Sequence, residues 1–189
     1  MVYTAQKNPA ALRSQELICK AMCALMGALP FAEITVTRIC QEAGVGRKTF
    51  YRNFERKEDV VELMIDYLRE EYEQELEHIS PEEAAGCHFR FLSERMEFML
   101  LLYKAGCVPL LTERFSVILP RVMPRWSADE RENAYRTAAV VAGTEAVIRL
   151  WAERGFRETP EELVQLHRYA LGECVTAPPP GADRHIDGA

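Results

Sequence analysis

The chain has 189 residues, of which 48% are hydrophobic and 28% are charged. These proportions are typical of a globular protein and exclude an intrinsically disordered one. No uncharged apolar run approaches the roughly 18 residues that span a membrane, and the N-terminus lacks the apolar core of a secretory signal. We therefore expect a cytoplasmic protein without a membrane partner.

The formal net charge of −6 conceals an asymmetry along the chain. Residues 1–60 hold nine basic and six acidic side chains, whereas residues 61–189 hold fourteen basic and twenty-three acidic ones. A basic head on an acidic body is expected of a protein that contacts phosphate with one end only.

The six cysteines show no C-x-x-C pair. Cys19 and Cys23 stand one helical turn apart, which is compatible with two buried small residues. We expect reduced structural thiols, with disulfides as the alternative. The remaining cysteines are Cys40, Cys87, Cys107 and Cys174.

The first sixty residues read as three helices. Apolar residues at helical spacing predict a helix over about 10–29, which Pro30 ends. Thr35 is a plausible N-cap for a short second helix, Gly44 stops it, and a third helix is expected over about 47–54. Two helices joined by a short glycine-containing turn form a helix-turn-helix.

The remaining chain also reads as helical, over about 57–79, 81–105, 109–123, 128–154 and 160–175. Ser80, Ser127 and Thr159 each precede a Glu by three residues, which is the pattern of a capping box. Gly106 and Gly155 are expected stops. We therefore expect an all-α fold with a helix-turn-helix DNA-binding domain over 1–56, a helical regulatory and dimerisation domain over 57–176, and a disordered tail over 177–189.

The segment from Phe31 to Val60 resembles the DNA-binding head of the TetR family. Gly46 stands where the family commonly has a capping Ser or Thr, and Cys40 replaces the usual Ala. The resemblance covers about residues 10–60 and implies a transcriptional regulator, with a repressor favoured, that carries a ligand-responsive helical body. The positions in register are Thr35, Val36, Ile39, Ala43, Gly44, Val45, Thr49, Phe50, Tyr51, Phe54 and Lys57.

The third helix carries the candidate DNA contacts. Its expected outward donors fit guanine edges and phosphates, with a solvated basic face as the alternative. These donors are Arg47, Lys48, Arg52 and Asn53, of which Arg47 and Lys48 are the candidates for base reading. The resemblance implies phosphate contacts for Thr49, Tyr51 and Lys57, to which Thr37 and Arg38 could add; Tyr51 could instead be a core aromatic.

The run from Ala142 to Gly155 resembles the closing part of TetR-type bodies, in particular the group typified by the dihydroxyacetone-operon activator. The family implies that the last two long helices pair with those of a second copy, with packing inside one subunit as the alternative. A homodimer would read a palindromic operator in double-stranded DNA. The expected interface residues are Ala139, Gly143, Ala146, Leu150, Leu166, Tyr169 and Ala170.

Aromatic and Met residues between 81 and 126 could line a pocket for an apolar or aromatic small-molecule effector that releases the DNA. The alternative is plain core, and a protein partner could replace the small molecule in a co-activator. The candidate pocket residues are Phe89, Met96, Met99, Tyr103, Phe115 and Trp126.

Two other classes of function find little in the sequence. A metal or redox sensor would have to gather His78, Cys87, His88 and Cys107, which lack a dedicated ligand spacing. The chain has no G-x-S-x-G, phosphate-binding Gly-rich loop or H-E-x-x-H, so we expect no enzyme, no bound metal and no cofactor. The effector, the operator and the sign of regulation stay open.

Overall fold

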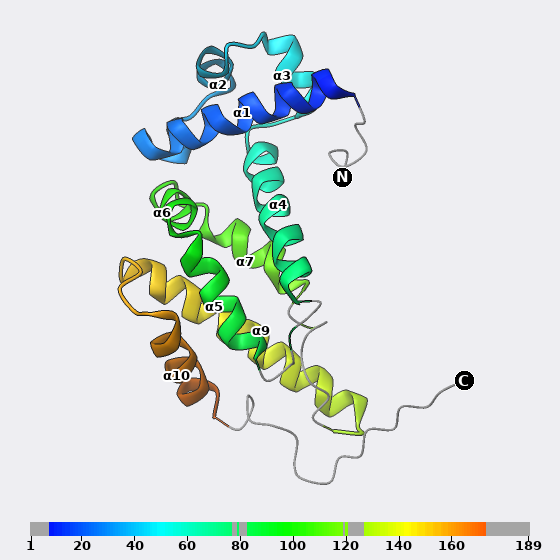
Figure 1. Cartoon of the computed structure of the whole chain (residues 1–189), viewed down its shortest axis with the longest axis vertical. Coiled ribbons are helices and arrows are strands. Elements are labelled where there is room, and N and C mark those ends of the chain that lie inside the picture. The colour runs from blue at the N-terminus through cyan, green and yellow to red at the C-terminus, as the bar shows by residue number, and fades with distance from the viewer. Residues whose placement is uncertain (1–7, 77–78, 80–82, 119, 121–126, 173–189) are drawn as a thin grey trace, which may run out of the picture. The chain divides into compact units, whose positions relative to one another are not determined.

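The computed structural model describes residues 8–76, 79, 83–118, 120 and 127–172. Within these ranges every regular element is a helix, which confirms the all-α fold (Figure 1). None of the described helices is both long and apolar enough to cross a membrane. The expected cap at Ser80 and the expected tail over 177–189 lie outside the described residues, as do His78, Trp126 and Cys174.

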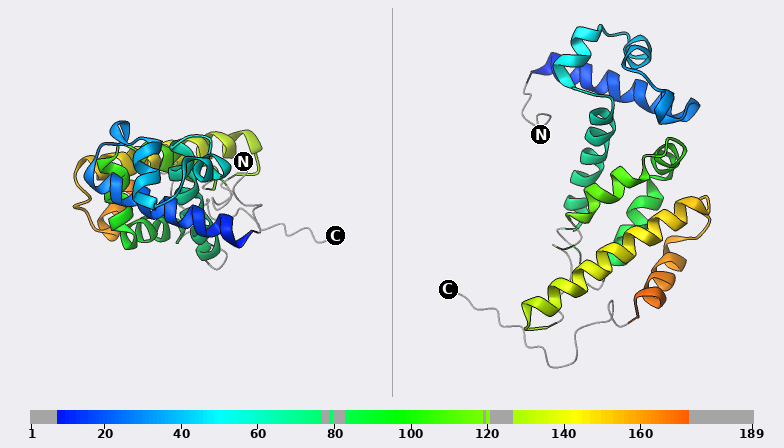
Figure 2. Two further views of the ribbon diagram at one scale, coloured as in Figure 1. Left: turned by 90° about the horizontal axis from the view of Figure 1, so that it is seen from above. Right: turned by 180° about the vertical axis from the view of Figure 1, so that it is seen from behind.

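The chain folds as two compact units, of which the first comprises residues 1–72 and 95–114. Its N-terminal head consists of α1 (Pro9–Ala28), a 3-10 turn (Phe31–Glu33), α2 (Val36–Ala43) and α3 (Arg47–Asn53). Helix α1 packs against both α2 and α3, and the three stay together in every view (Figures 1 and 2). The unit also holds α6 (Met96–Lys104) and most of α4 (Glu58–Leu76) and α7 (Val108–Ser116).

The head has a complete apolar core. Ile18, Met22, Ile39, Phe50 and Phe54 each expose 1% of their surface or less. Burying such a side chain contributes about 1.5–3 kcal/mol, so this core holds α3 firmly on its inner side. Other apolar residues of the head are less buried: Val36 and Val45 are half-buried and Leu17 is exposed.

The predicted boundaries of the second helix are confirmed. The Thr35 hydroxyl accepts a hydrogen bond from the Arg38 amide at 3.3 Å. At the other end Gly44 has φ 65°, a left-handed conformation that costs glycine nothing and lets the Val45 amide donate to the Cys40 carbonyl at 3.0 Å. The turn of the helix-turn-helix is thus specified locally.

The second unit comprises residues 73–94 and 115–189, and its described part is built on α5 (Ala84–Glu94), α9 (Glu130–Glu153) and α10 (Pro160–Leu171). Helix α10 packs against both α5 and α9 (Figure 2). The predicted capping box at Thr159 is confirmed, because its hydroxyl accepts from the Glu162 amide at 3.3 Å and its own amide donates to the Glu162 carboxylate at 2.8 Å.

Three boundaries differ from the sequence-based expectation. The helix expected over 81–105 is two helices, broken at Arg95 (φ −111°, ψ 32°) where the chain passes from the second unit to the first. The helix expected over 109–123 ends at Ser116, and residues 117 and 118 form a turn. The cap expected at Ser127 is Asp129, whose carboxylate accepts from the Arg131 amide at 2.8 Å, while Ser127 accepts from the Asp129 amide in a preceding turn.

The two expected glycine stops are confirmed. Gly106 and Gly155 have φ 72° and 74°, and they follow the ends of α6 and α9. The division of the chain into domains at residues 56 and 57 stays a prediction.

Candidate nucleic-acid interface

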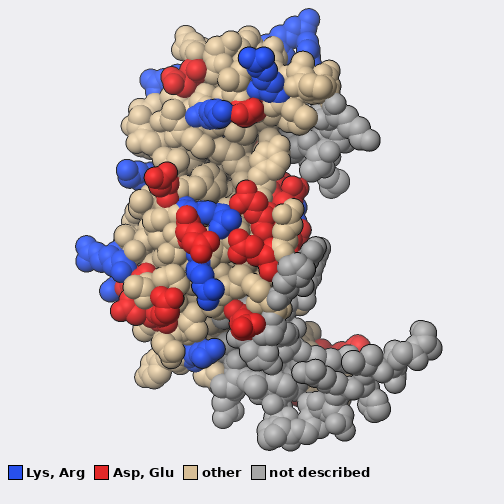
Figure 3. All heavy atoms as spheres, viewed as in Figure 1, with Lys and Arg blue, Asp and Glu red and all other residues tan. Residues whose placement is uncertain are grey.

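Helix α3 presents a basic outer face. Its inner side is fixed by Phe50, which is fully buried, and this leaves Arg47, Lys48, Tyr51 and Arg52 exposed on the other side. In the space-filling view, basic side chains project over α2 and α3 (Figure 3). The seven residues of α3 therefore carry three exposed cationic side chains and one exposed tyrosine.

The cations of this face lie apart from the acidic side chains that the structure describes. Within the described part of the chain, none of Arg47, Lys48 and Arg52 forms an ion pair with an acidic side chain. The guanidinium carbon of Arg47 lies 5.9 Å from the centroid of the Tyr51 ring, a cation–π contact that orders both side chains. An ordered donor array with unpaired positive charge suits a polyanion.

Tyr51 is placed as a surface residue. Half of its surface is exposed, and its ring meets Phe50 edge-on with centroids 5.5 Å apart. The alternative of a core aromatic therefore does not fit this structure, and the phenol hydroxyl stays on the same face as the three cations.

The candidate phosphate contacts on α2 lie in its first turn. Thr37 and Arg38 are both exposed, and one Arg38 guanidinium nitrogen donates to the Glu33 carbonyl at 3.3 Å. Thr49, on α3, is half-buried. The positions of Thr37, Arg38 and Thr49 are compatible with contacts to DNA phosphates, and these contacts stay predictions.

Asn53 does not face outward as expected. Its side chain is only 7% exposed, and its amide nitrogen donates to the Thr49 carbonyl at 2.8 Å, four residues back on α3. Because α3 ends at Asn53, this bond closes the last turn of the helix. In this structure Asn53 stabilises α3 rather than presenting a donor on its outer face.

Lys57 is surrounded by backbone carbonyls. Its ammonium nitrogen lies 2.6 Å from the Phe31 carbonyl oxygen, 2.8 Å from that of Ile34 and 3.4 Å from that of Ala32, and 4.4 Å from the centroid of the Phe31 ring. An ammonium group has three donors, and three acceptors meet them here. Lys57 therefore ties the turn before α2 to the start of α4, and a phosphate contact by Lys57 stays a prediction.

Asp59 is a positioning residue that the sequence reasoning missed. It is 5% exposed, and its carboxylate accepts from the Glu55 amide at 2.8 Å, the Arg56 amide at 3.0 Å and the Arg56 guanidinium at 2.9 Å. These bonds fix the turn between α3 and α4. The only signal in the sequence was an acidic residue in the first turn of the fourth helix, where the helix dipole favours negative charge.

The candidate pocket residues fall into both units. Phe89 and Phe115 are buried in the second unit, where the His88 ring lies 5.8 Å from each of them by centroid. The α6 candidates belong to the first unit: Met99 is buried, Met96 is half-buried and Tyr103 is exposed. A pocket built from them stays a prediction.

Two buried histidines accompany the aromatic cluster of the second unit. The Thr144 hydroxyl donates to the Val140 carbonyl at 2.8 Å, so its oxygen accepts from the Nε2 of His167 at 2.9 Å. Burial lowers the pKa of His88 to about 3 and the pKa of His167 to about 4. Both rings are therefore neutral at neutral pH.

The alternative metal site is not assembled in the described part of the chain. Cys87 and His88 belong to the second unit and Cys107 to the first. Among the described residues, no three His, Cys, Asp or Glu side chains converge on one point.

An apolar face runs along the outer side of α9 and α10. Tyr169 is 90% exposed, and Leu150 and Leu166 are each about half exposed. Ala139, Ala146 and Ala170 are exposed on the same two helices. Gly143 differs, because a Cβ atom there would collide with the Leu171 side chain of the same chain. The role of all these residues in a dimer interface stays a prediction.

Comparison with known proteins finds a family model that matches most of the head. Residues 18–64 match the family model described as bacterial regulatory proteins, tetR family. No curated protein matches the chain at a significant level.

Solved structures extend the likeness to nearly the whole chain. A TetR transcriptional regulator from Streptococcus agalactiae 2603V superposes with a TM-score of 0.67 at 17% identity, covering 86% of this chain and 95% of that one. The dihydroxyacetone kinase operon activator DhaS gives 0.56 at 19% identity, covering 84% and 93%. FadR of Thermus thermophilus, a TetR-family repressor in complex with lauroyl-CoA, gives 0.51 at 20% identity, covering 89% and 98%. At these identities the likeness shows a shared fold.

Proposed function

From the premise that this chain carries the N-terminal domain of the TetR family of bacterial regulatory proteins, we propose that it is a sequence-specific DNA-binding transcriptional regulator. The observation that carries the proposal is the outer face of α3, with three exposed cations that have no ion-pair partner among the described residues. Phe50 anchors the buried side of α3 in the core of the head, and the opposite, cationic side suits insertion into the major groove of DNA.

Within that face the roles divide by position. The N-terminal residues of a recognition helix reach base edges, so we assign base reading to Arg47 and Lys48 at the start of α3. Arginine can bond both acceptors of a guanine edge. Thr37, Arg38, Thr49, Tyr51 and Arg52 then take the phosphate contacts that set orientation.

The chain acts as a homodimer in this proposal. A helix-turn-helix regulator places two recognition helices about 34–36 Å apart in successive turns of the major groove. The exposed apolar face of α9 and α10 supports pairing of these helices with a second copy, since Leu150, Leu166 and Tyr169 have much of their surface free to be covered. The operator is then an imperfect palindrome.

A small molecule releases the dimer from DNA in this proposal, and the chain acts as a repressor. The T. thermophilus repressor that shares the fold is described as a complex with lauroyl-CoA, which supports an apolar effector. The effector would bind more tightly to a dimer whose two α3 helices are not spaced for successive turns of the major groove. DNA and effector would then weaken each other's binding by the same factor. A second candidate function is activation of transcription, since DhaS, which shares the fold, is described as an operon activator.

Selection from random double-stranded DNA tests the proposal. We expect a palindrome whose affinity falls about 5- to 150-fold per half-site in Arg47→Ala, because the substitution removes one base contact from each subunit of the dimer. Arg157→Ala is the matched control, because it removes an exposed cation from the second unit. Weak binding without sequence preference, or equal losses in the two variants, would contradict the proposal.

A further inference from the structure

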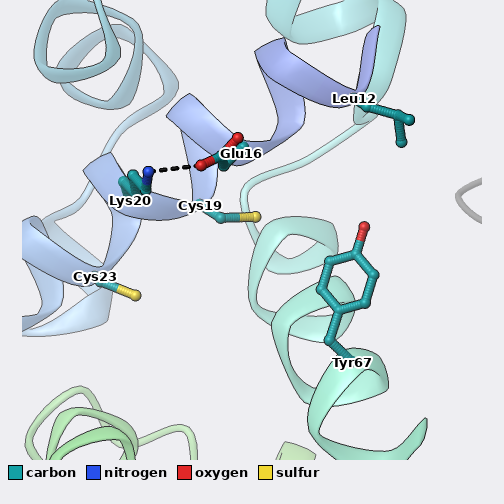
Figure 4. Close-up of a pocket in the computed structure, with 6 residues that line it drawn as sticks. All are labelled: Leu12, Glu16, Cys19, Lys20, Cys23 and Tyr67. Carbon is teal, nitrogen blue, oxygen red and sulfur yellow. Dashed lines mark hydrogen bonds and ion pairs between the residues drawn. The ribbon is translucent and has the colours of Figure 1, made fainter. Parts of the chain in front are cut away.

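A pocket of about 560 Å³ lies in the first unit, on the side of α1 that faces α4. Both Cys19 and Cys23 line it and are half-buried, rather than fully buried as their spacing had suggested. In the close-up their sulfur atoms point away from the axis of α1 into this space (Figure 4). The pocket is lined by Leu12, Glu16, Cys19, Lys20, Cys23 and Tyr67.

A third sulfur reaches Cys23 from α4. The Sδ atom of Met64 lies 3.5 Å from the Sγ atom of Cys23. Sulfur ligands held about 2.3 Å from one metal ion lie roughly 3.8–4.0 Å apart, so Cys23 and Met64 already stand close to the separation of two ligands of one ion. Cys19 stands one turn of α1 before Cys23 and lines the same pocket.

The chemistry of these donors selects the ion. Among the described residues no three His, Cys, Asp or Glu side chains converge, so this site has no zinc-like set of ligands. Glu16 is held in an ion pair with Lys20 at 2.6 Å. Two thiolates and one thioether are soft ligands, which favour Cu(I).

We propose that Cys19, Cys23 and Met64 form a Cu(I)-binding site between α1 and α4. Binding replaces two S–H bonds by two Cu–S bonds, releases two protons to solvent, and adds the neutral thioether as the third ligand; the copper is not oxidised or reduced. The assignment is independent of the function proposed for α3.

The site binds by displacing protons. Burial raises the pKa of Cys19 to about 12 and also raises the pKa of Cys23, so both groups are thiols at neutral pH. A weakly thiophilic ion such as Mg²⁺ does not compete, because it has no affinity for sulfur that could offset the cost of deprotonation.

A competition titration tests the site on the full-length, reduced protein without oxygen. Cu(I) is supplied as its complex with the chromophoric chelator bicinchoninate, and the protein should withdraw one equivalent per chain. Cys19→Ser/Cys23→Ser should abolish this transfer, and Met64→Leu should weaken it by about tenfold or more. Cys40→Ala is the matched control, since that thiol is buried on α2 away from the pocket, and it should bind as the unaltered chain does.

A second measurement needs no substitution and is therefore unaffected by a variant that fails to fold. One equivalent of Cu(I) should protect Cys19 and Cys23 from alkylation, mapped by mass spectrometry, and leave the reactivity of Cys40, Cys87 and Cys107 unchanged. Absence of one-to-one transfer, protection spread over all cysteines, or a Met64→Leu variant that binds like the unaltered chain would overturn the three-sulfur site.

Discussion

The N-terminal head and the α9–α10 pair leave opposite kinds of surface exposed. The head encloses its core within one chain, with Phe50 and Phe54 at 1% exposure or less, and what remains outside on α3 is mostly cationic. The α9–α10 pair leaves Tyr169 90% exposed and Leu150 55% exposed. The first surface suits an anionic polymer, whereas the second suits another apolar surface.

The difference also separates two sources of stability. The head draws its stability from contacts inside the chain, which do not depend on concentration. Leu150 and Leu166 are about half exposed, so covering each would add about half of the roughly 1.5–3 kcal/mol that full burial of a leucine contributes, and only when a second surface is present. The following experiments test that contrast.

The largest effect is expected inside the head. Phe50→Ala should lower the free energy of unfolding by about 3–5 kcal/mol, because it leaves a cavity where a fully buried ring packs 5.6 Å from Phe54 by centroid. Tyr51→Ala, on the next position of α3, should cost less than about 1 kcal/mol and reduce DNA affinity instead. Urea denaturation compares them, and equal losses of stability would show that α3 is not divided into these two faces.

Lowering the pH should destabilise the second unit selectively. The pKa values of His88 and His167 are lowered to about 3 and about 4, whereas an unfolded histidine titrates near about 6.5. Below about pH 6.5 these two histidines bind protons in the unfolded chain but stay neutral in the folded chain. The free energy of unfolding therefore decreases as the pH falls from about 6.5 toward 4. Between pH 7 and 5 the loss should be on the order of 2–4 kcal/mol for both groups.

His167→Gln tests the source of that pH dependence. Glutamine can keep a hydrogen bond to Thr144 but does not titrate, so the slope of unfolding free energy against pH should fall by about half. Thermal melts between pH 5 and 7 measure it. A slope unchanged in this variant would assign the pH dependence to other groups.

Charge on the apolar face should weaken the dimer. Leu166→Asp should raise the dissociation constant by at least about 30-fold, the effect of losing a contact worth about 2 kcal/mol. Gln165→Glu, exposed at the adjacent position of α10, should change it little. Sedimentation equilibrium distinguishes these outcomes, and a monomer in the unaltered chain at micromolar concentration would remove the dimer from the proposal.

The smallest effects are expected at the helix caps. Thr159→Ala removes a complete capping box and should cost about 1 kcal/mol. Gly46→Ser should stabilise the chain by a few tenths of a kcal/mol, because α3 has no side-chain cap and a Cβ at Gly46 meets no atom within 4 Å. A loss of stability in Gly46→Ser would mean that the α3 start cannot accept a cap.

The head was largely predictable because its signals are local. Thr35 and Gly44 act on backbone groups a few residues away, so a single sequence reveals them. The contacts of Lys57 with carbonyls 23–26 residues earlier, and the approach of Met64 to Cys23 across 41 residues, depend on tertiary packing that no spacing rule encodes.

The second unit was less predictable for the same reason. The apolar pattern of Leu92, Met96 and Met99 continues through the break at Arg95, and neither Gly nor Pro marks it. At the start of α9, Ser127 and Asp129 both fit the rule for a cap, and the structure shows that the later one serves. The pairing of Gly143 with Leu171 similarly required the fold.

The carbonyl cradle around Lys57 constrains which residue can occupy that position. Three oxygens converging on one point match a compact ammonium, whereas a guanidinium spreads its donors in a plane and cannot point them all at one centre. An exchange of Lys57 for arginine keeps the charge and still loses the geometry. The three carbonyl oxygens therefore favour lysine over arginine at this position by their geometry, although both side chains carry the same charge.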